Sequence, residues 1–111
     1  MNREFKDAIE NSPIIAAIKN DAELHQCLTC DSQVIFILYG DLCNIADIVD
    51  TVKSAGKIAL VHLDLIGGLN AKEIAVDFIK KYTKADGIIS TKPALIKHAG
   101  EIGLTSVLRL F

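Results

Sequence analysis

Short runs of β-branched and aliphatic residues alternate along this chain with longer segments in which apolar residues recur at helical spacing. Each short run is nearly continuous in apolar character, which is typical of strands that are covered on both faces. The predicted strands are Ile14–Lys19, Val34–Tyr39, Ile58–Asp64, Gly87–Ser90 and Val107–Phe111.

The segments between these runs are long enough to form helices, so consecutive strands are expected to run parallel to one another. No linker or low-complexity stretch interrupts the series, and we expect one domain over residues 1–111. The predicted helices are Arg3–Glu10, Asp21–Cys30, Asn44–Ser54, Ala71–Tyr82 and Pro93–Ile102.

Two architectures fit an unbroken series of βα units, the open doubly wound sheet and the closed (β/α) barrel. A dinucleotide-binding sheet usually has a glycine-rich turn after its first strand, whereas Lys19–Ala22 follows the first predicted strand here. The chain also ends inside a predicted strand, after about five of the eight units of a barrel. The predicted fold is therefore α/β, an incomplete TIM-barrel-like parallel barrel, and we expect a sequence truncated at its carboxyl terminus.

Composition narrows the possible roles of the chain. Its 111 residues are 50% hydrophobic and 23% charged, which is enough for one core, and no apolar run approaches the length of a membrane span. The amino terminus lacks the apolar stretch of a signal peptide, so we expect a cytoplasmic protein with free thiols on its three cysteines. A net charge of −2 argues against generic binding of nucleic acids.

The third predicted strand carries the first candidate chemistry. Alternation along it places His62 and Asp64 on one face, at the end that forms the functional mouth of a (β/α) barrel. A ligand site explains this pair, and so does a core histidine that is hydrogen-bonded to a neighbouring aspartate. Both explanations remain open on the sequence alone.

The fifth predicted strand places Arg109 toward the barrel axis, where a buried cation requires a partner. A carboxylate such as that of Asp64 or a bound phosphate would serve equally well. Lys19 and Lys92 end or follow other strands and add positive charge at the same mouth, which suits a small anion. No catalytic constellation or metal-ligand cluster stands out. The candidate ligand-binding residues are Lys19, His62, Asp64, Lys92 and Arg109.

Two other groupings carry less weight. Cys27 and Cys30 have the spacing of a redox or zinc pair, but they lie late in a predicted helix instead of at a strand-to-helix junction. Lys80, Lys81 and Lys84 cluster near a helix end, where lysines usually form a solvated face and complement the helix dipole, although a nucleic-acid patch is the alternative.

Four segments together resemble the glycerol-3-phosphate-responsive antiterminator family: Ser12–Lys19, Val61–Leu69, Asp86–Lys92 and Leu108–Phe111. The resemblance implies a barrel fold and a bacterial regulator that binds the leader mRNA of glycerol utilisation genes when glycerol 3-phosphate is present. It also implies that glycerol 3-phosphate is an effector, that no other cofactor is needed and that no reaction is catalysed.

The alternative is a barrel enzyme that acts on a small phosphorylated metabolite, with His62 or Asp64 as general acid or base. Five parallel strands would leave the first and the last as open edges, which predicts self-association of the chain. Without the later barrel loops that often hold phosphate, we expect glycerol 3-phosphate to bind at about 1 mM or more weakly.

Overall fold

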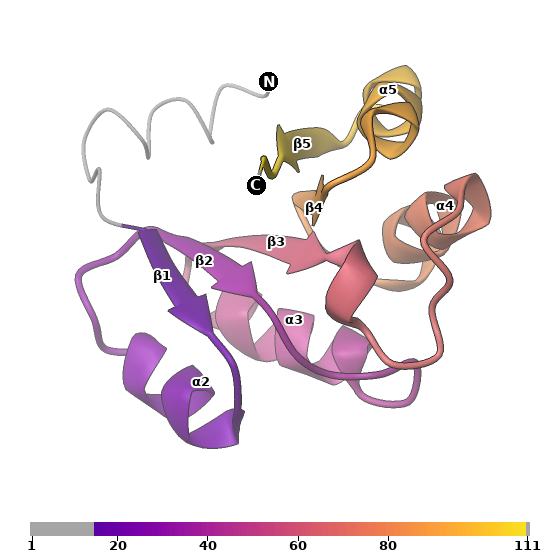
Figure 1. Cartoon of the computed structure of the whole chain (residues 1–111). Coiled ribbons are helices and arrows are strands. Elements are labelled where there is room, and N and C mark those ends of the chain that lie inside the picture. The colour runs from indigo at the N-terminus through magenta and orange to yellow at the C-terminus, as the bar shows by residue number, and fades with distance from the viewer. Residues whose placement is uncertain (1–14, 111) are drawn as a thin grey trace.

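The computed structural model describes residues 15–110, which form a parallel sheet of five strands in the order β1-β2-β3-β4-β5 (Figure 1). Every pair of neighbouring strands is parallel, as the βα series predicted. The strands are β1 (Ile15–Ile18), β2 (Val34–Ile37), β3 (Ile58–His62), β4 (Gly87–Ser90) and β5 (Thr105–Leu108).

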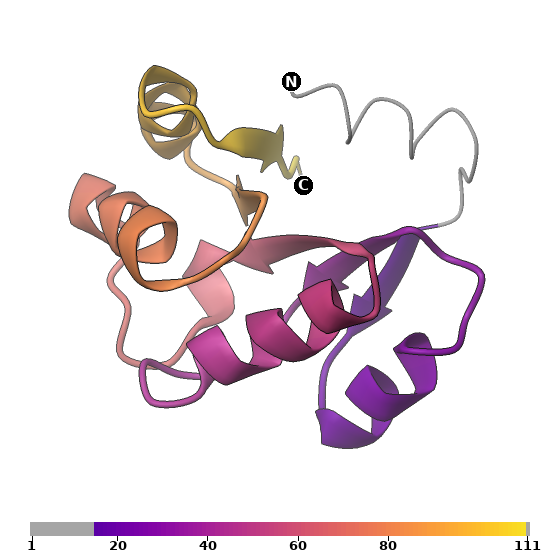
Figure 2. The same cartoon turned by 180° about the vertical axis from the view of Figure 1, so that it is seen from behind.

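The helices lie on the outer side of this curved sheet, as the front and back views both show (Figures 1 and 2). Sequential strand order with helices on one side is the arrangement of a (β/α) barrel wall, whereas a doubly wound sheet reverses its order and carries helices on both faces. The predicted incomplete barrel is confirmed. The helices are α2 (Asp21–Cys27), α3 (Ile45–Ser54), α4 (Glu73–Tyr82) and α5 (Pro93–Glu101), and a short 3-10 helix, η1 (Leu63–Leu65), follows β3.

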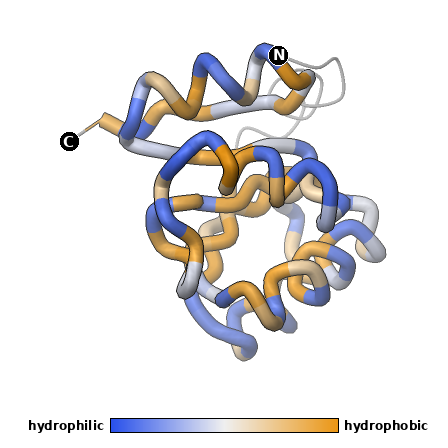
Figure 3. The backbone as a smooth tube through the Cα atoms, turned by 90° about the vertical axis from the view of Figure 1, so that its right-hand side faces the viewer, coloured by the Kyte–Doolittle hydropathy of each residue, from blue (hydrophilic) through white to orange (hydrophobic). Residues whose placement is uncertain are grey.

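Alternation along the strands divides the buried apolar residues between two clusters. In β3, Ala59 and Val61 belong to the large cluster between the sheet and the helices, whereas Ile58 and Leu60 belong to a smaller cluster on the inner face. Figure 3 shows that the strands are largely apolar, while the helices alternate between apolar and polar residues. The two-faced alternation predicted for β3 is therefore confirmed as far as His62.

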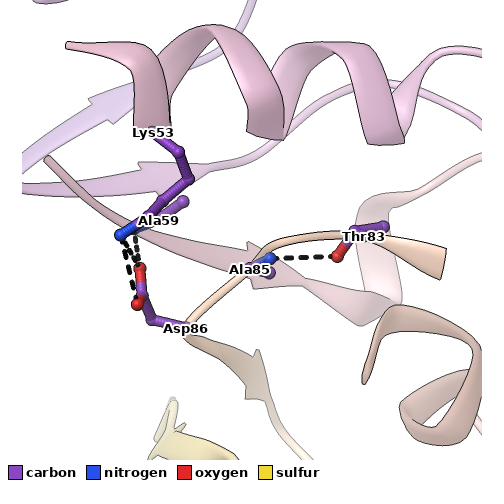
Figure 4. Close-up of polar contacts among 5 residues, drawn as sticks. All are labelled: Lys53, Ala59, Thr83, Ala85 and Asp86. Atoms are coloured by element: carbon purple, nitrogen blue, oxygen red, sulfur yellow. Dashed lines mark hydrogen bonds and ion pairs between the residues drawn. The ribbon is translucent and has the colours of Figure 1, made fainter. Parts of the chain in front are cut away.

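A polar network closes the amino-terminal end of the sheet (Figure 4). Asp86, directly before β4, accepts hydrogen bonds from Lys53 Nζ at 2.9 and 3.2 Å and from the Ala59 amide at 2.8 Å. Beside this carboxylate, the hydroxyl oxygen of Thr83 accepts from the Ala85 amide at 3.1 Å. The network links α3 and β3 to the residue before β4, and it therefore stabilises the packing of these three elements.

The strand boundaries correct two predictions. The fifth strand runs over Thr105–Leu108 and not over Val107–Phe111, because its register is set by β4, where Gly87 pairs with Thr105. Because the first residues of this strand are polar, the apolar pattern of the sequence did not reveal where it starts. β3 ends at His62 because the chain turns into η1, so Asp64 does not belong to the strand. The predicted helix at Arg3–Glu10 lies outside the described residues, as does Phe111.

β1 and β5 form the two edges of the sheet within residues 15–110. Self-association through these edges stays a prediction. Among the described helices, none has the length and apolar character needed to cross a membrane.

Candidate functional site

A pocket of about 310 Å³ opens at the carboxyl ends of the strands, on the inner face of the wall. Three of the predicted residues meet there, since Lys19 follows β1, His62 ends β3 and Arg109 follows β5. Apolar side chains form the rest of its lining: Phe36, Leu38, Ile89 and Val107.

His62 is the buried polar group of this pocket, with 2% of its surface exposed. Its Nε2 lies 3.2 Å from Arg109 Nη1, and because a guanidinium only donates, Nε2 accepts and the ring proton is on Nδ1. No other described residue offers Nδ1 a hydrogen-bond partner. Burial lowers the pKa of His62 and the Arg109 charge lowers it further, while Asp64 opposes both. The ring is therefore neutral at pH 7.

Asp64 does not line the pocket but organises the loop that follows β4. Its carboxylate accepts from the Ser90 hydroxyl at 3.2 Å, from the Thr91 amide at 3.1 Å and from the Thr91 hydroxyl at 2.8 Å. Burial alone would raise the pKa of Asp64, but these hydrogen bonds and the nearby His62 lower it. The alternative of a core histidine bonded to Asp64 is wrong, because the hydrogen bond of His62 is made with Arg109.

Lys92 also supports the loop and does not line the pocket. Its amide donates to Ser90 Oγ at 3.1 Å, and its ammonium donates to the Ala71 carbonyl at 3.3 Å. Lys92 and Asp64 thus lie at the predicted end of the barrel, but their side chains form hydrogen bonds within the chain, around the β4–α5 connection.

Arg109 corrects a further prediction, because its side chain is exposed and not buried at the barrel axis. Its amide donates to the Ser90 carbonyl at 2.9 Å, which extends the β4–β5 ladder one residue beyond β5. That bond keeps the side chain on the same face as Val107, in the pocket lining, while its position past the strand leaves it open to water. The predicted face is right and the predicted burial is wrong.

The apolar lining was missed by the sequence reasoning. Phe36 and Leu38 lie on the same face of the β2 segment as Val34, and Ile89 pairs in register with His62. Strand alternation could have placed them on the inner face, but an apolar residue in a strand looks the same whether it packs a core or lines a pocket.

The cysteine pair gives no support for metal or redox chemistry. Cys27 is buried, and Cys30 donates its thiol proton to the Cys27 carbonyl, with 3.1 Å between sulfur and oxygen. Burial raises the pKa of the Cys27 thiol, which makes it a poor nucleophile. Within residues 15–110 no group of His, Cys, Asp or Glu side chains is arranged to hold a metal ion.

The fold and this mouth define a barrel-type protein with a pocket that has an apolar wall and two cationic side chains. Residues 14–111 match the sequence model of the family described as glycerol-3-phosphate responsive antiterminator. Because this match spans most of the chain, the chain belongs to that family.

Relatives agree with this assignment. The chain is 43% identical over 103 residues to uncharacterized protein YgcP of Escherichia coli, covering 93% of this chain and 54% of YgcP. It also resembles the crystal structure of the glycerol uptake operon antiterminator regulatory protein of Listeria monocytogenes, with a TM-score of 0.83, 30% identity, and coverage of 87% and 52% of the two chains. For a glycerol uptake operon antiterminator-related protein of Thermotoga maritima the TM-score is 0.76 at 34% identity, with coverage of 86% and 53%. The chain thus spans about half the length of these relatives.

Proposed function

We propose that this chain acts in a cytoplasmic transcription antiterminator that binds the leader mRNA of glycerol utilisation genes in response to glycerol 3-phosphate. It does so without catalysis and without a further cofactor. Family membership supports the regulatory role. The observation that carries the effector assignment is the mouth pocket, where two cationic side chains and a neutral histidine meet an apolar wall.

The phosphate of the effector binds between Arg109 and Lys19 in this proposal. A guanidinium presents a planar fork of donors that matches phosphate oxygens, and an ammonium adds a second positive charge. Both residues are exposed at the pocket, so an anion can reach them without first displacing buried groups.

The glycerol part binds deeper, against His62. The Nδ1 proton of the neutral ring needs an acceptor, and a glycerol hydroxyl oxygen would supply one. Val107 and Ile89 contact the carbon chain, and the volume of about 310 Å³ suits a small metabolite. Satisfying a buried donor is favourable, so this contact adds specificity for an effector that carries hydroxyl groups.

The enzymatic alternative has less support from the same geometry. His62 Nε2 is engaged by Arg109, and both carboxylate oxygens of Asp64 accept hydrogen bonds from the β4–α5 loop. Neither group is therefore placed as an available acid or base. Turnover of glycerol phosphates or their diesters by the purified chain would reverse this conclusion.

Titration of the chain with glycerol 3-phosphate, followed by NMR, tests the effector site. We expect a dissociation constant of about 1 mM or weaker for this chain, and about tenfold weaker binding for Arg109→Gln, because charge-assisted hydrogen bonds to phosphate are lost. Lys97→Gln removes a lysine from the exposed side of α5 and serves as the control. Equal affinities for the two variants would contradict the proposed phosphate position.

Filter binding tests the RNA partner. Leader RNA should bind more tightly when glycerol 3-phosphate is present, and unrelated RNA should bind weakly under both conditions. Tight binding of unrelated RNA without the effector, with a steep dependence on salt, would contradict an effector-gated regulator.

A further inference from the structure

An apolar stripe that is partly exposed to solvent runs along α4. Ile74, Phe78 and Tyr82 are spaced by four residues, which aligns them along one side of the helix. Ile74 is 71% exposed and Tyr82 is 59% exposed. Together with Asp77 and Lys81 they line a groove of about 250 Å³. Exposed large apolar residues gathered in one groove indicate a surface that binds something.

Aromatic rings and a cation occupy the carboxyl-terminal end of this groove. The ring centroids of Phe78 and Tyr82 are 5.3 Å apart, and Lys81 Nζ lies 5.4 Å from the centroid of Tyr82. Phe78 also packs against the large apolar cluster under the helices. The exposed ring of Tyr82 therefore contacts the ring of Phe78, which is fixed by the apolar cluster, and the ammonium group of Lys81 lies beside it.

The positive charge beside Tyr82 comes from Lys81. Asp77, the acidic residue of the groove, lies 2.7 Å from His98 Nε2. Lys81 forms no ion pair with any described residue.

We propose that this face of α4 is a contact surface for single-stranded RNA, with one base stacked on Tyr82 and a flanking phosphate bound by Lys81. This inference rests on the proposed antiterminator function and assigns it an RNA-binding surface. Exposed aromatic rings next to basic side chains are the usual means of holding unpaired bases. A groove formed by a single helix admits a flat base, but it offers no second wall for an amphipathic protein helix.

The test measures the affinity of leader RNA by fluorescence anisotropy, with glycerol 3-phosphate in excess. Tyr82→Ala should weaken binding by about 5-fold to about 100-fold, since one stacked base is lost. Tyr82→Phe keeps the ring and should stay within about twofold of the parent chain. Lys81→Gln should reduce the slope of log affinity against log salt by about 0.7, whereas Lys97→Gln on α5 should leave it unchanged.

Circular dichroism and thermal unfolding establish that each variant is folded. If the parent chain binds no leader RNA, the antiterminator proposal itself is wrong. If the parent chain binds and Tyr82→Ala binds equally well, only the surface assignment is wrong. An equal loss in Tyr82→Phe would rule out stacking, and a change in sedimentation of Tyr82→Ala without a change in RNA affinity would assign the face to a second copy of the chain.

Discussion

The two ends of the sheet use similar residues in different ways. Lys57 lies directly before β3, is 5% exposed and donates to the carbonyls of Cys30 and Ser32 at 2.8 and 2.6 Å. Lys19 lies directly after β1 and remains exposed in the mouth pocket. The ammonium group of Lys57 links two segments of the chain by hydrogen bonds, whereas Lys19 is exposed to water.

A similar contrast separates Asp86 from His62. At the amino-terminal end, the Asp86 carboxylate is bound by an ammonium and a backbone amide. At the carboxyl-terminal end, His62 keeps a buried nitrogen that no other described residue satisfies. Paired groups stabilise a fold, whereas an unsatisfied buried group costs stability and is justified where a ligand completes it. The comparison therefore predicts loss of stability from changes at one end and loss of binding from changes at the other.

The largest effect is expected from Gly87→Ala at the start of β4. A Cβ atom there would overlap the carbonyl oxygen of Thr105 on β5 and would lie 2.9 Å from Leu60 Cδ2. Because backbone atoms cannot move aside without breaking the β4–β5 ladder, we expect a loss of about 3 kcal/mol or more in the free energy of unfolding. Urea unfolding followed by circular dichroism measures it.

Gly100→Ala is the matched control, because nothing lies within 4 Å of the added Cβ in α5. Alanine at this helical position should be neutral or stabilising by up to about 1 kcal/mol. Similar stabilities for the two variants would show that the β4–β5 spacing is not as tight as described.

Asp86→Ala should have the next largest effect. It leaves Lys53 without its carboxylate and the Ala59 amide without its acceptor, and we expect a loss of about 2 kcal/mol by urea unfolding. The control is Asp50→Ala, which removes an exposed carboxylate 4.0 Å from Lys84 and should cost less than about 0.5 kcal/mol. If both variants lose the same amount, the network at the amino-terminal end is no more stabilising than a surface ion pair.

The smallest effect on stability is expected from His62→Leu at the mouth. The substitution removes a buried nitrogen that lacks a partner and also the nitrogen that accepts from the exposed Arg109, so these effects oppose each other and the free energy of unfolding at about pH 7 should change by less than about 1 kcal/mol. The pKa of His62 is lowered in the folded chain, so the unfolded chain takes up its proton first as pH falls below about 6.5. The parent chain should therefore lose stability on acidification, and His62→Leu should lose less.

His98 is a control for which the pH dependence of stability has the opposite sign. The Asp77 carboxylate raises the pKa of His98, so its contribution to stability is present below about pH 6.5 and is lost as pH rises through the folded-state value. His98→Gln should thus weaken the chain more in acid than in base. Urea midpoints at about pH 5.5 and about pH 8 measure both histidines, and parallel profiles for His62→Leu and His98→Gln would contradict the assignment.

Much of the wall could be predicted from the sequence because strands and helices leave local patterns. β4 was predicted with its observed bounds, and the alternation that placed His62 on the inner face is confirmed. The start of β5 could not be predicted in this way, since Thr105 is polar and enters the sheet through its register with Gly87.

The candidate site was only partly visible in the sequence. Strand ends predicted that the candidate residues lie at one edge of the sheet, and Lys19, His62 and Arg109 do line one pocket there. Asp64 and Lys92 belong to the same edge but bind the β4–α5 and β3–α4 connections. Polar side chains that follow a strand cannot be assigned a role from the sequence, because their hydrogen-bond partners are 21 to 27 residues away.

The sequence by itself determined the order of the elements, the parallel direction of the strands and the face on which His62 and Arg109 lie. These properties follow from periodicity and from the length of the connections, which are local. Only the tertiary structure decided which charges are paired and which are exposed in the pocket. Lys57 and Lys19 are the same residue type beside a strand, and their roles differ because two carbonyl groups from a distant segment meet one of them and the pocket opens beside the other.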